Sequence, residues 1–85
     1  MEEKSPLARL KELLPNLEGK VHLADYDTVK EVIAKASDSS YSFRKRFLGM
    51  TTTYLENNTR EAELYRTNSE SRNLMQKAIE IIKEL

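Results

Sequence analysis

The sequence predicts a mostly helical α+β domain, in which a two-stranded hairpin lies between helices. Three segments have the apolar spacing of amphipathic helices. Residues 50–55 are β-branched and aromatic, and residues 62–67 alternate between apolar and polar with a period of two. The segment between them, residues 56–59, has the composition of a tight turn. The expected order is helix, strand, helix, helix, two-stranded hairpin, helix.

The first helix is predicted to begin at Ser5-Pro6. Serine can accept a hydrogen bond from a free amide, and proline has the backbone angle of a first helical position. Pro15 is expected to end the helix because it has no amide hydrogen to donate. Residues 16–19 then form a turn. One face of this helix is apolar and consists of Leu7, Leu10, Leu13 and Leu14.

A brief edge strand is predicted at residues 20–24, where apolar and polar residues alternate. Asp25 or Asp27 can cap the helix that follows, and Thr28 with Glu31 has the spacing of a capping box. The apolar residues of this second helix recur at i, i+3, i+4 and i+7, namely Val29, Val32, Ile33 and Ala36.

A short third helix is predicted at residues 41–48, with Gly49 as its left-handed C-terminal cap. In the hairpin that follows, Asn57-Asn58 forms the two-residue turn. A helical interpretation of residues 50–67 competes, because residues 60–66 are good helix formers. The hairpin is preferred because three consecutive threonines favour a helix poorly. If residues 50–67 are helical instead, the predicted fold is an all-helical, four-helix adaptor.

The last helix is predicted at residues 69–85, with Asn68 or Ser69 as its cap. It carries two adjacent apolar stripes, and the second lacks a partner in so small a chain. We therefore expect residues 1–68 to form the domain and residues 69–85 to be a dimerisation element. The expected homodimer interface consists of Leu74, Ala78, Ile81 and Leu85.

The composition limits the chemistry that this chain can perform. The absence of cysteine excludes disulfides, thiolate metal sites and a cysteine nucleophile. No nucleophile–base pair, phosphate-binding glycine loop or metal-ligand cluster is recognisable, so we expect no catalytic residue, cofactor, metal site or small-molecule ligand. No apolar run reaches the roughly 20 residues that span a membrane, and the charged N-terminus does not match a signal peptide. A cytoplasmic protein that is not an enzyme is expected.

The predicted order of elements over residues 5–85 resembles the winged helix-turn-helix superfamily. MarR-like and PadR-like regulators leave the second wing strand through the pattern Tyr-x-Leu-Thr-x-x-Gly-x-x-Leu-Leu. Here Tyr65 and the apolar pair Leu74-Met75 match that pattern, whereas Thr67 and Ser71 replace its leucine and glycine.

The resemblance implies a DNA-binding protein, in the form of a small homodimeric transcriptional regulator with specific or general affinity for double-stranded DNA. Residues 41–48 would be the recognition helix in the major groove, and residues 50–67 a wing on the adjacent backbone. Exposed cationic and hydroxyl groups there suit phosphates and base edges. The expected DNA-binding residues are Ser39, Ser40, Tyr41, Ser42, Arg44, Lys45, Arg46, Asn57, Asn58 and Arg60.

The charge balance opposes this interpretation. Fourteen basic and fourteen acidic residues cancel, and the isoelectric point is near 6.6. Any DNA binding must therefore come from a local patch rather than from a field around the whole molecule. The alternative function is a protein–protein interaction module, winged or all-helical, that does not bind DNA.

Overall fold

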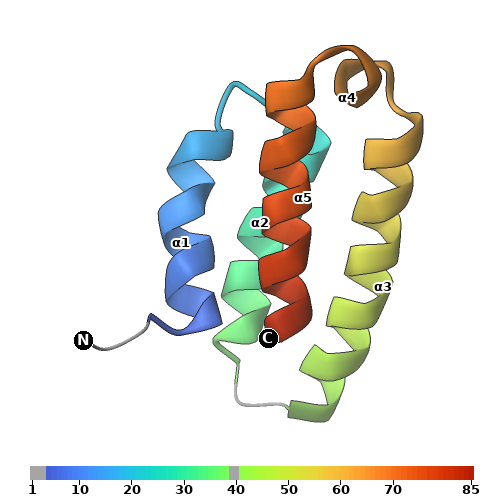
Figure 1. The fold of residues 1–85 in the computed structure, drawn as a ribbon. Coiled ribbons are helices and arrows are strands. Elements are labelled where there is room, and N and C mark those ends of the chain that lie inside the picture. The colour runs from blue at the N-terminus through green and yellow to red at the C-terminus, as the bar shows by residue number, and fades with distance from the viewer. Residues whose placement is uncertain (1–3, 39–40) are drawn as a thin grey trace.

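Every element in the described part of the chain is a helix (Figure 1). The structure is a computed structural model that describes residues 4–38 and 41–85, with the side chains of the second range given from residue 45 onward. Neither range contains a strand, so the α+β prediction with its edge strand and hairpin is wrong. The helices are α1 (Pro6–Leu17), α2 (Leu23–Ala36), α3 (Tyr41–Glu61), α4 (Glu63–Thr67) and α5 (Ser69–Glu84).

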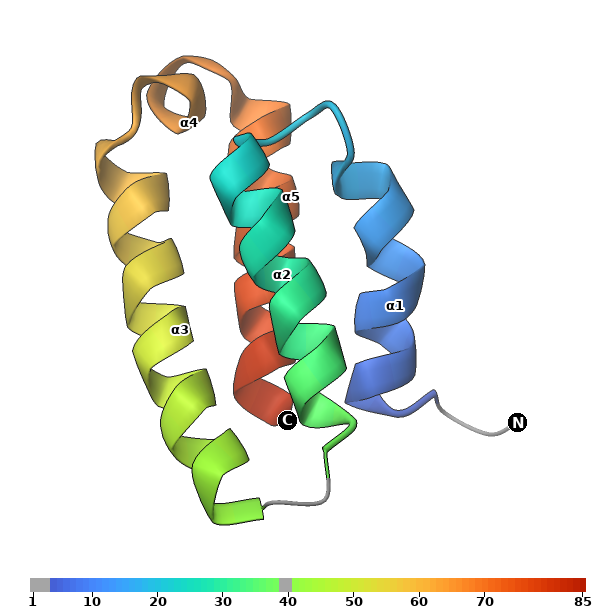
Figure 2. The same cartoon turned by 180° about the vertical axis from the view of Figure 1, so that it is seen from behind.

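The four long helices form an antiparallel bundle, and the short α4 closes one end (Figure 1). Helix α5 contacts α1 on one side and α3 on the other. Helix α2 also contacts both α1 and α3, on the opposite side of the bundle (Figure 2). Successive helices are therefore neighbours in space, as in an up-down-up-down bundle.

Helix α5 supplies a large share of the single core. Both of its apolar stripes are buried within the chain, because α1 covers one flank and α3 the other. Its buried apolar residues are Met75, Ala78, Ile79, Ile81 and Ile82. Residues 69–85 thus belong to the same packed unit as the residues before them, and the second stripe does not lack a partner.

Helix α1 begins as predicted and ends later. The Ala8 amide donates to Ser5 Oγ at 3.2 Å, which confirms the cap. The helix passes through Pro15 to Leu17, which is fully buried. Pro15 lies in the last turn, where its missing donor costs one hydrogen bond at an exposed position.

Helix α2 begins at Leu23, inside the segment predicted as a strand. Neither predicted cap applies: the N-cap residue is His22, without a side-chain bond, and Asp25 lies inside the first turn. Thr28 does not act in a capping box, because its hydroxyl donates to the Ala24 carbonyl oxygen at 2.8 Å.

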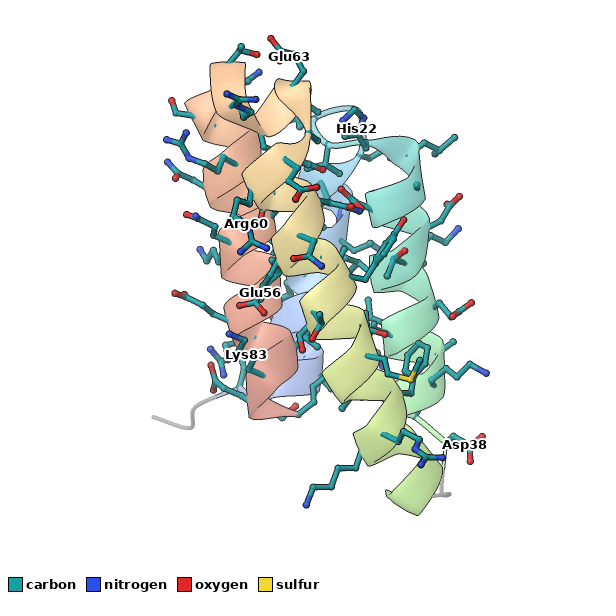
Figure 3. All side chains as sticks on the ribbon, turned by 90° about the vertical axis from the view of Figure 1, so that its right-hand side faces the viewer. His22, Asp38, Glu56, Arg60, Glu63 and Lys83 are labelled. Carbon is teal, nitrogen blue, oxygen red and sulfur yellow. The ribbon has the colours of Figure 1, made fainter. Side chains whose placement is uncertain are left out.

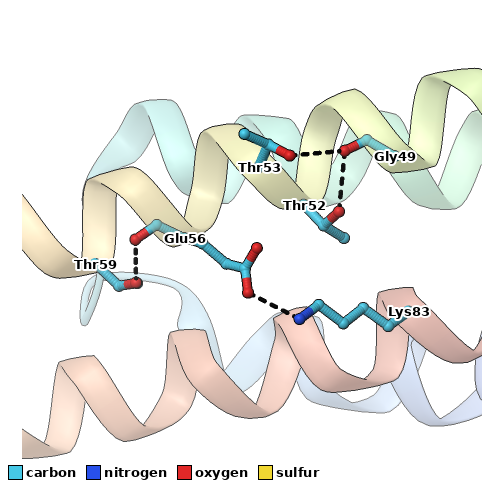
Figure 4. Close-up of polar contacts among 6 residues, drawn as sticks. All are labelled: Gly49, Thr52, Thr53, Glu56, Thr59 and Lys83. Atoms are coloured by element: carbon cyan, nitrogen blue, oxygen red, sulfur yellow. Dashed lines mark hydrogen bonds and ion pairs between the residues drawn. The ribbon is translucent and has the colours of Figure 1, made fainter.

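Helix α3 contains the predicted third helix, the glycine that should end it and most of the predicted hairpin. Gly49 does not have a positive φ and does not act as a cap. The hydroxyls of Thr52 and Thr53 donate to its carbonyl oxygen at 3.1 and 3.2 Å (Figure 4). β-Branched residues disfavour a helix by only a few tenths of a kcal/mol each. Burial of Leu48 and Leu55 against the core outweighs that cost.

The chain from Tyr65 to Met75 forms α4 and the first turns of α5. The Ser71 amide donates to Asn68 Oδ1 at 3.2 Å, so Asn68 is confirmed as the cap of α5. Tyr65, expected on the second wing strand, instead lies fully buried in α4. The strands on which the winged-helix layout depends are therefore absent from the described ranges.

Candidate functional site

A polar hollow of about 650 Å³ lies where α3, α4 and α5 meet. Its rim carries three arginines from three different helices: Arg60 in the last turn of α3, Arg66 in α4 and Arg72 in α5. We call this hollow the arginine groove. Its remaining lining consists of Glu56, Thr59, Tyr65, Gln76, Ile79, Glu80 and Lys83.

None of the three arginines has a carboxylate partner among the described residues. Arg60 donates to the side-chain oxygen of Asn57. Arg72 donates to the Tyr65 carbonyl oxygen at 3.4 Å, near the upper limit for a hydrogen bond. Arg66 is exposed, and no described side chain binds it. The guanidinium groups are therefore left to solvent or to a bound anion.

The carboxylates of the groove do not neutralise the arginines. Glu56 is held by Lys83, whose ammonium lies 2.8 Å from its carboxylate (Figure 4). Glu80 is exposed on α5. The four cations and two carboxylates leave an excess of two positive charges in one hollow. In Figure 3, Arg60, Glu56 and Lys83 follow one another along the contact between α3 and α5.

A buried hydrogen-bonded network fixes α4, and with it Arg66. The Asp25 carboxyl is 1% exposed and accepts from the Tyr65 hydroxyl at 2.6 Å and from the Asn58 side-chain amide at 2.8 Å. The His22 amide donates to the Tyr65 oxygen at 3.2 Å. Burial and the hydrogen bond to Asp25 raise the pKa of the Tyr65 phenol above its ordinary value. The network joins α2, α3 and α4 at one end of the bundle.

The predicted DNA-binding residues do not gather in one place. Ser39 and Ser40 lie outside the described residues, as do the side chains of Tyr41, Ser42 and Arg44. Lys45 and Arg46 are exposed near the start of α3. Lys45 lines a second, smaller hollow at the far end of the contact between α3 and α5.

The residues predicted for the wing have three different environments. Asn57 is exposed and accepts from Arg60, whereas Asn58 is half-buried and donates to Asp25. Only Arg60 lies in the arginine groove. Arg66 and Arg72 were missed, because the sequence places one on a strand and the other on an unremarkable helix face. Arg66 and Arg72 come close to Arg60 because the chain turns through α4. No local pattern in the sequence predicts this turn.

The predicted dimer residues belong to the interior or its edge. Ala78 and Ile81 are buried within the chain, and Leu74 and Leu85 are half-buried against the same core. A dimer through these four side chains would therefore require the bundle to open. The oligomeric state itself stays a prediction.

The described residues contain neither a metal-binding cluster nor a helix that could span a membrane. No group of three metal-binding side chains occurs within these ranges. None of the helices described has the length and apolarity needed to cross a membrane. We find no match to this chain among protein-family models, curated proteins or solved structures.

Proposed function

We propose that this chain is a nucleic-acid-binding helical bundle, whose arginine groove binds the phosphodiester backbone. The observation that carries the proposal is the convergence of Arg60, Arg66 and Arg72 on one hollow without a carboxylate partner. A planar guanidinium matches two phosphate oxygens, and it sheds its hydration more readily than a lysine ammonium does.

Further cations extend the positive surface along α3 and favour a chain of phosphates over a single anion. Lys83 lines the groove together with the arginines, and Lys45 and Arg46 lie near the opposite end of α3. Lys45 and Arg60 are separated by fifteen helical residues, or about 22 Å along the axis. That length exceeds the reach of one phosphate and suits several successive ones.

Because the net charge is zero, affinity must come from local phosphate contacts and must depend strongly on salt. Neutralisation of three phosphates by the groove arginines alone contributes about −2.7 to the slope of the logarithm of the binding constant against the logarithm of the salt concentration. Binding is therefore expected to weaken at least about 40-fold between about 50 and 200 mM salt.

Fluorescence anisotropy tests this proposal. Labelled random-sequence duplex and single-stranded oligonucleotides are titrated with the full chain at low salt, and the salt series gives the slope. The two oligonucleotides distinguish a double-stranded from a single-stranded target. No binding of either at about 50 mM salt would refute the proposal.

The groove is tested by the triple variant Arg60→Ala/Arg66→Ala/Arg72→Ala. Loss of three phosphate contacts should make the salt slope shallower by about 2.7. A matched control is Lys11→Ala/Lys30→Ala/Lys77→Ala, which removes the same charge from exposed positions on other faces of the bundle. Equal losses in both variants would show that general charge, and not the groove, supplies the affinity.

A second candidate function is an all-helical interaction module, and one exposed apolar pair favours it. Met50 and Tyr54 lie one turn apart on α3 and are 70% and 48% exposed. An exposed apolar pair on one helix face is a natural site for a helix–helix contact. The expected homodimer would therefore form through α3 rather than α5. Sedimentation equilibrium of Met50→Lys/Tyr54→Lys would then show a monomer where the parent chain is a dimer.

A further inference from the structure

The hollow lined by Lys45 has the chemistry of a binding pocket for a small amphipathic anion. It measures about 270 Å³ and lies between the first half of α3 and the end of α5. Its inner wall is apolar and comes from Leu48, Ile82 and Leu85. We call it the end pocket. It is separate from the arginine groove, except that Lys83 lines both.

Two ammonium groups lie at this apolar wall, and no aspartate or glutamate with a described side chain lines the pocket. Lys45 is exposed and makes no ion pair with a described residue. Lys83 gives one bond to Glu56, and an ammonium has three donors, so two remain. The pocket thus offers an apolar surface with a positive edge.

Gly49 lines the same pocket. The packing of the chain does not explain why this position is a glycine. It lies inside α3 without a positive φ, and a Cβ built there meets nothing within 4 Å. Glycine inside a helix is destabilising relative to alanine. A larger side chain at this position would extend into open space beside the lysines. The glycine keeps the entrance of the pocket free.

We infer that the end pocket binds a small aliphatic carboxylate, with the carboxylate between Lys45 and Lys83 and the hydrocarbon chain on Leu48 and Ile82. The volume lies just below the range typical of drug-sized ligands. Hexanoate, with six carbons and two oxygens, is a probe of suitable size.

The test is a titration of the ¹⁵N-labelled full chain with hexanoate, followed by amide chemical shifts. Saturable shifts are expected at Leu48, Gly49 and Ile82, with a Kd on the order of 1 mM. Hexan-1-ol, which lacks the charge, and acetate, which lacks the chain, should each bind at least about fivefold more weakly. Hexan-1-ol binding as tightly as hexanoate would overturn the assignment, as would the absence of saturable shifts.

Two variants locate the ligand. Gly49→Leu should fill the pocket and weaken hexanoate binding at least about tenfold. Met50→Leu, at the neighbouring exposed position, is its control and should change nothing. Lys45→Gln should weaken binding about two- to fivefold, as expected for one exposed ion pair. If Gly49→Leu remains helical and binds hexanoate unchanged, the pocket is not the site.

Discussion

The Asp25 carboxyl explains why several individual residues were misinterpreted from the sequence. Asp25 and Asn58 were expected at the surface, as a cap and a turn, and Tyr65 was expected in a strand. In the structure the buried Asp25 carboxylate accepts hydrogen bonds from both the Asn58 amide and the Tyr65 hydroxyl. A buried polar group is stable only when its hydrogen bonds are satisfied, so the position of Asp25 depends on both donors.

Tyr65→Phe tests this dependence. The variant keeps the ring in its fully buried position but leaves one Asp25 oxygen without its donor. Leaving such a group unsatisfied costs about 1–3 kcal/mol in the free energy of unfolding. Urea denaturation measures the change. Tyr54→Phe, half exposed on α3, is the control and should stay within about 0.5 kcal/mol of the parent chain.

The raised pKa of Tyr65 predicts alkaline destabilisation. Above about pH 10 the phenol ionises in the unfolded chain but stays protonated in the folded one. The unfolded state then binds fewer protons, so the free energy of unfolding falls with rising pH, by up to about 1.4 kcal/mol per pH unit. Urea denaturation at about pH 9 and about pH 11 measures this loss. An equally steep loss in Tyr65→Phe would contradict the assignment to Tyr65.

At the scale of the helices, the two glycines have opposite roles. Gly19 has a φ of +77°, and the Lys20 amide donates to the Leu17 carbonyl oxygen at 3.0 Å across it. This is the geometry of a tight turn that requires positive φ at its third residue. Gly49, in contrast, has an ordinary helical backbone conformation, which any L-residue can adopt.

The alanine variants should therefore change stability in opposite directions. Gly49→Ala is expected to stabilise the chain by about 0.5–1 kcal/mol, because alanine loses less backbone entropy in a helix. Gly19→Ala should destabilise it by about 1–2 kcal/mol, because its Cβ opposes the left-handed conformation. Urea denaturation measures both. A destabilised Gly49→Ala would reveal a steric requirement at that position.

Helices with a strong apolar period and a good cap could be predicted from the sequence. Ser5 and Asn68 cap α1 and α5 as expected, and the apolar residues of α2 face the core. The failures lie where local preference opposes tertiary packing. Residues 51–53 favour strands locally, but burial of the neighbouring Leu48 and Leu55 outweighs that preference and holds them in α3.

The arginine groove could be predicted only in part, for a geometric reason. Arg60 was expected to bind phosphate, although on a wing. Arg66 and Arg72 join it because α3 and α5 run antiparallel and α4 turns the chain between them (Figure 1). Proximity of this kind arises from the topology of the bundle, and the spacing of the arginines along the sequence does not predict it.

At the scale of the whole molecule, α5 decides whether the chain folds. Ile81→Asp would bury an unpaired carboxylate between α5 and its neighbours, at a cost of at least about 3 kcal/mol. That cost is a large part of the stability of a domain of this size. Circular dichroism should show loss of the helical signal.

The control for Ile81→Asp is Lys77→Asp, which introduces the same side chain at an exposed position of the same helix. This control should remain helical. If Ile81→Asp stayed fully helical and only its mass in light scattering halved, the buried stripe would be a contact between two copies instead of part of one core.

The contact between α3 and α5 has a consequence for motion. Of the described α3 side chains, only Leu48 and Leu55 are both apolar and buried, and three further buried positions of that face are threonines, namely Thr51, Thr52 and Thr59. Helix α3 should therefore detach in brief local openings that leave α1, α2 and α5 together, so its amides should exchange hydrogen fastest of the long helices. Detachment of α3 also separates Arg60 from Arg72. An anion bound by both arginines would therefore hold α3 against α5 and slow hydrogen exchange of the α3 amides.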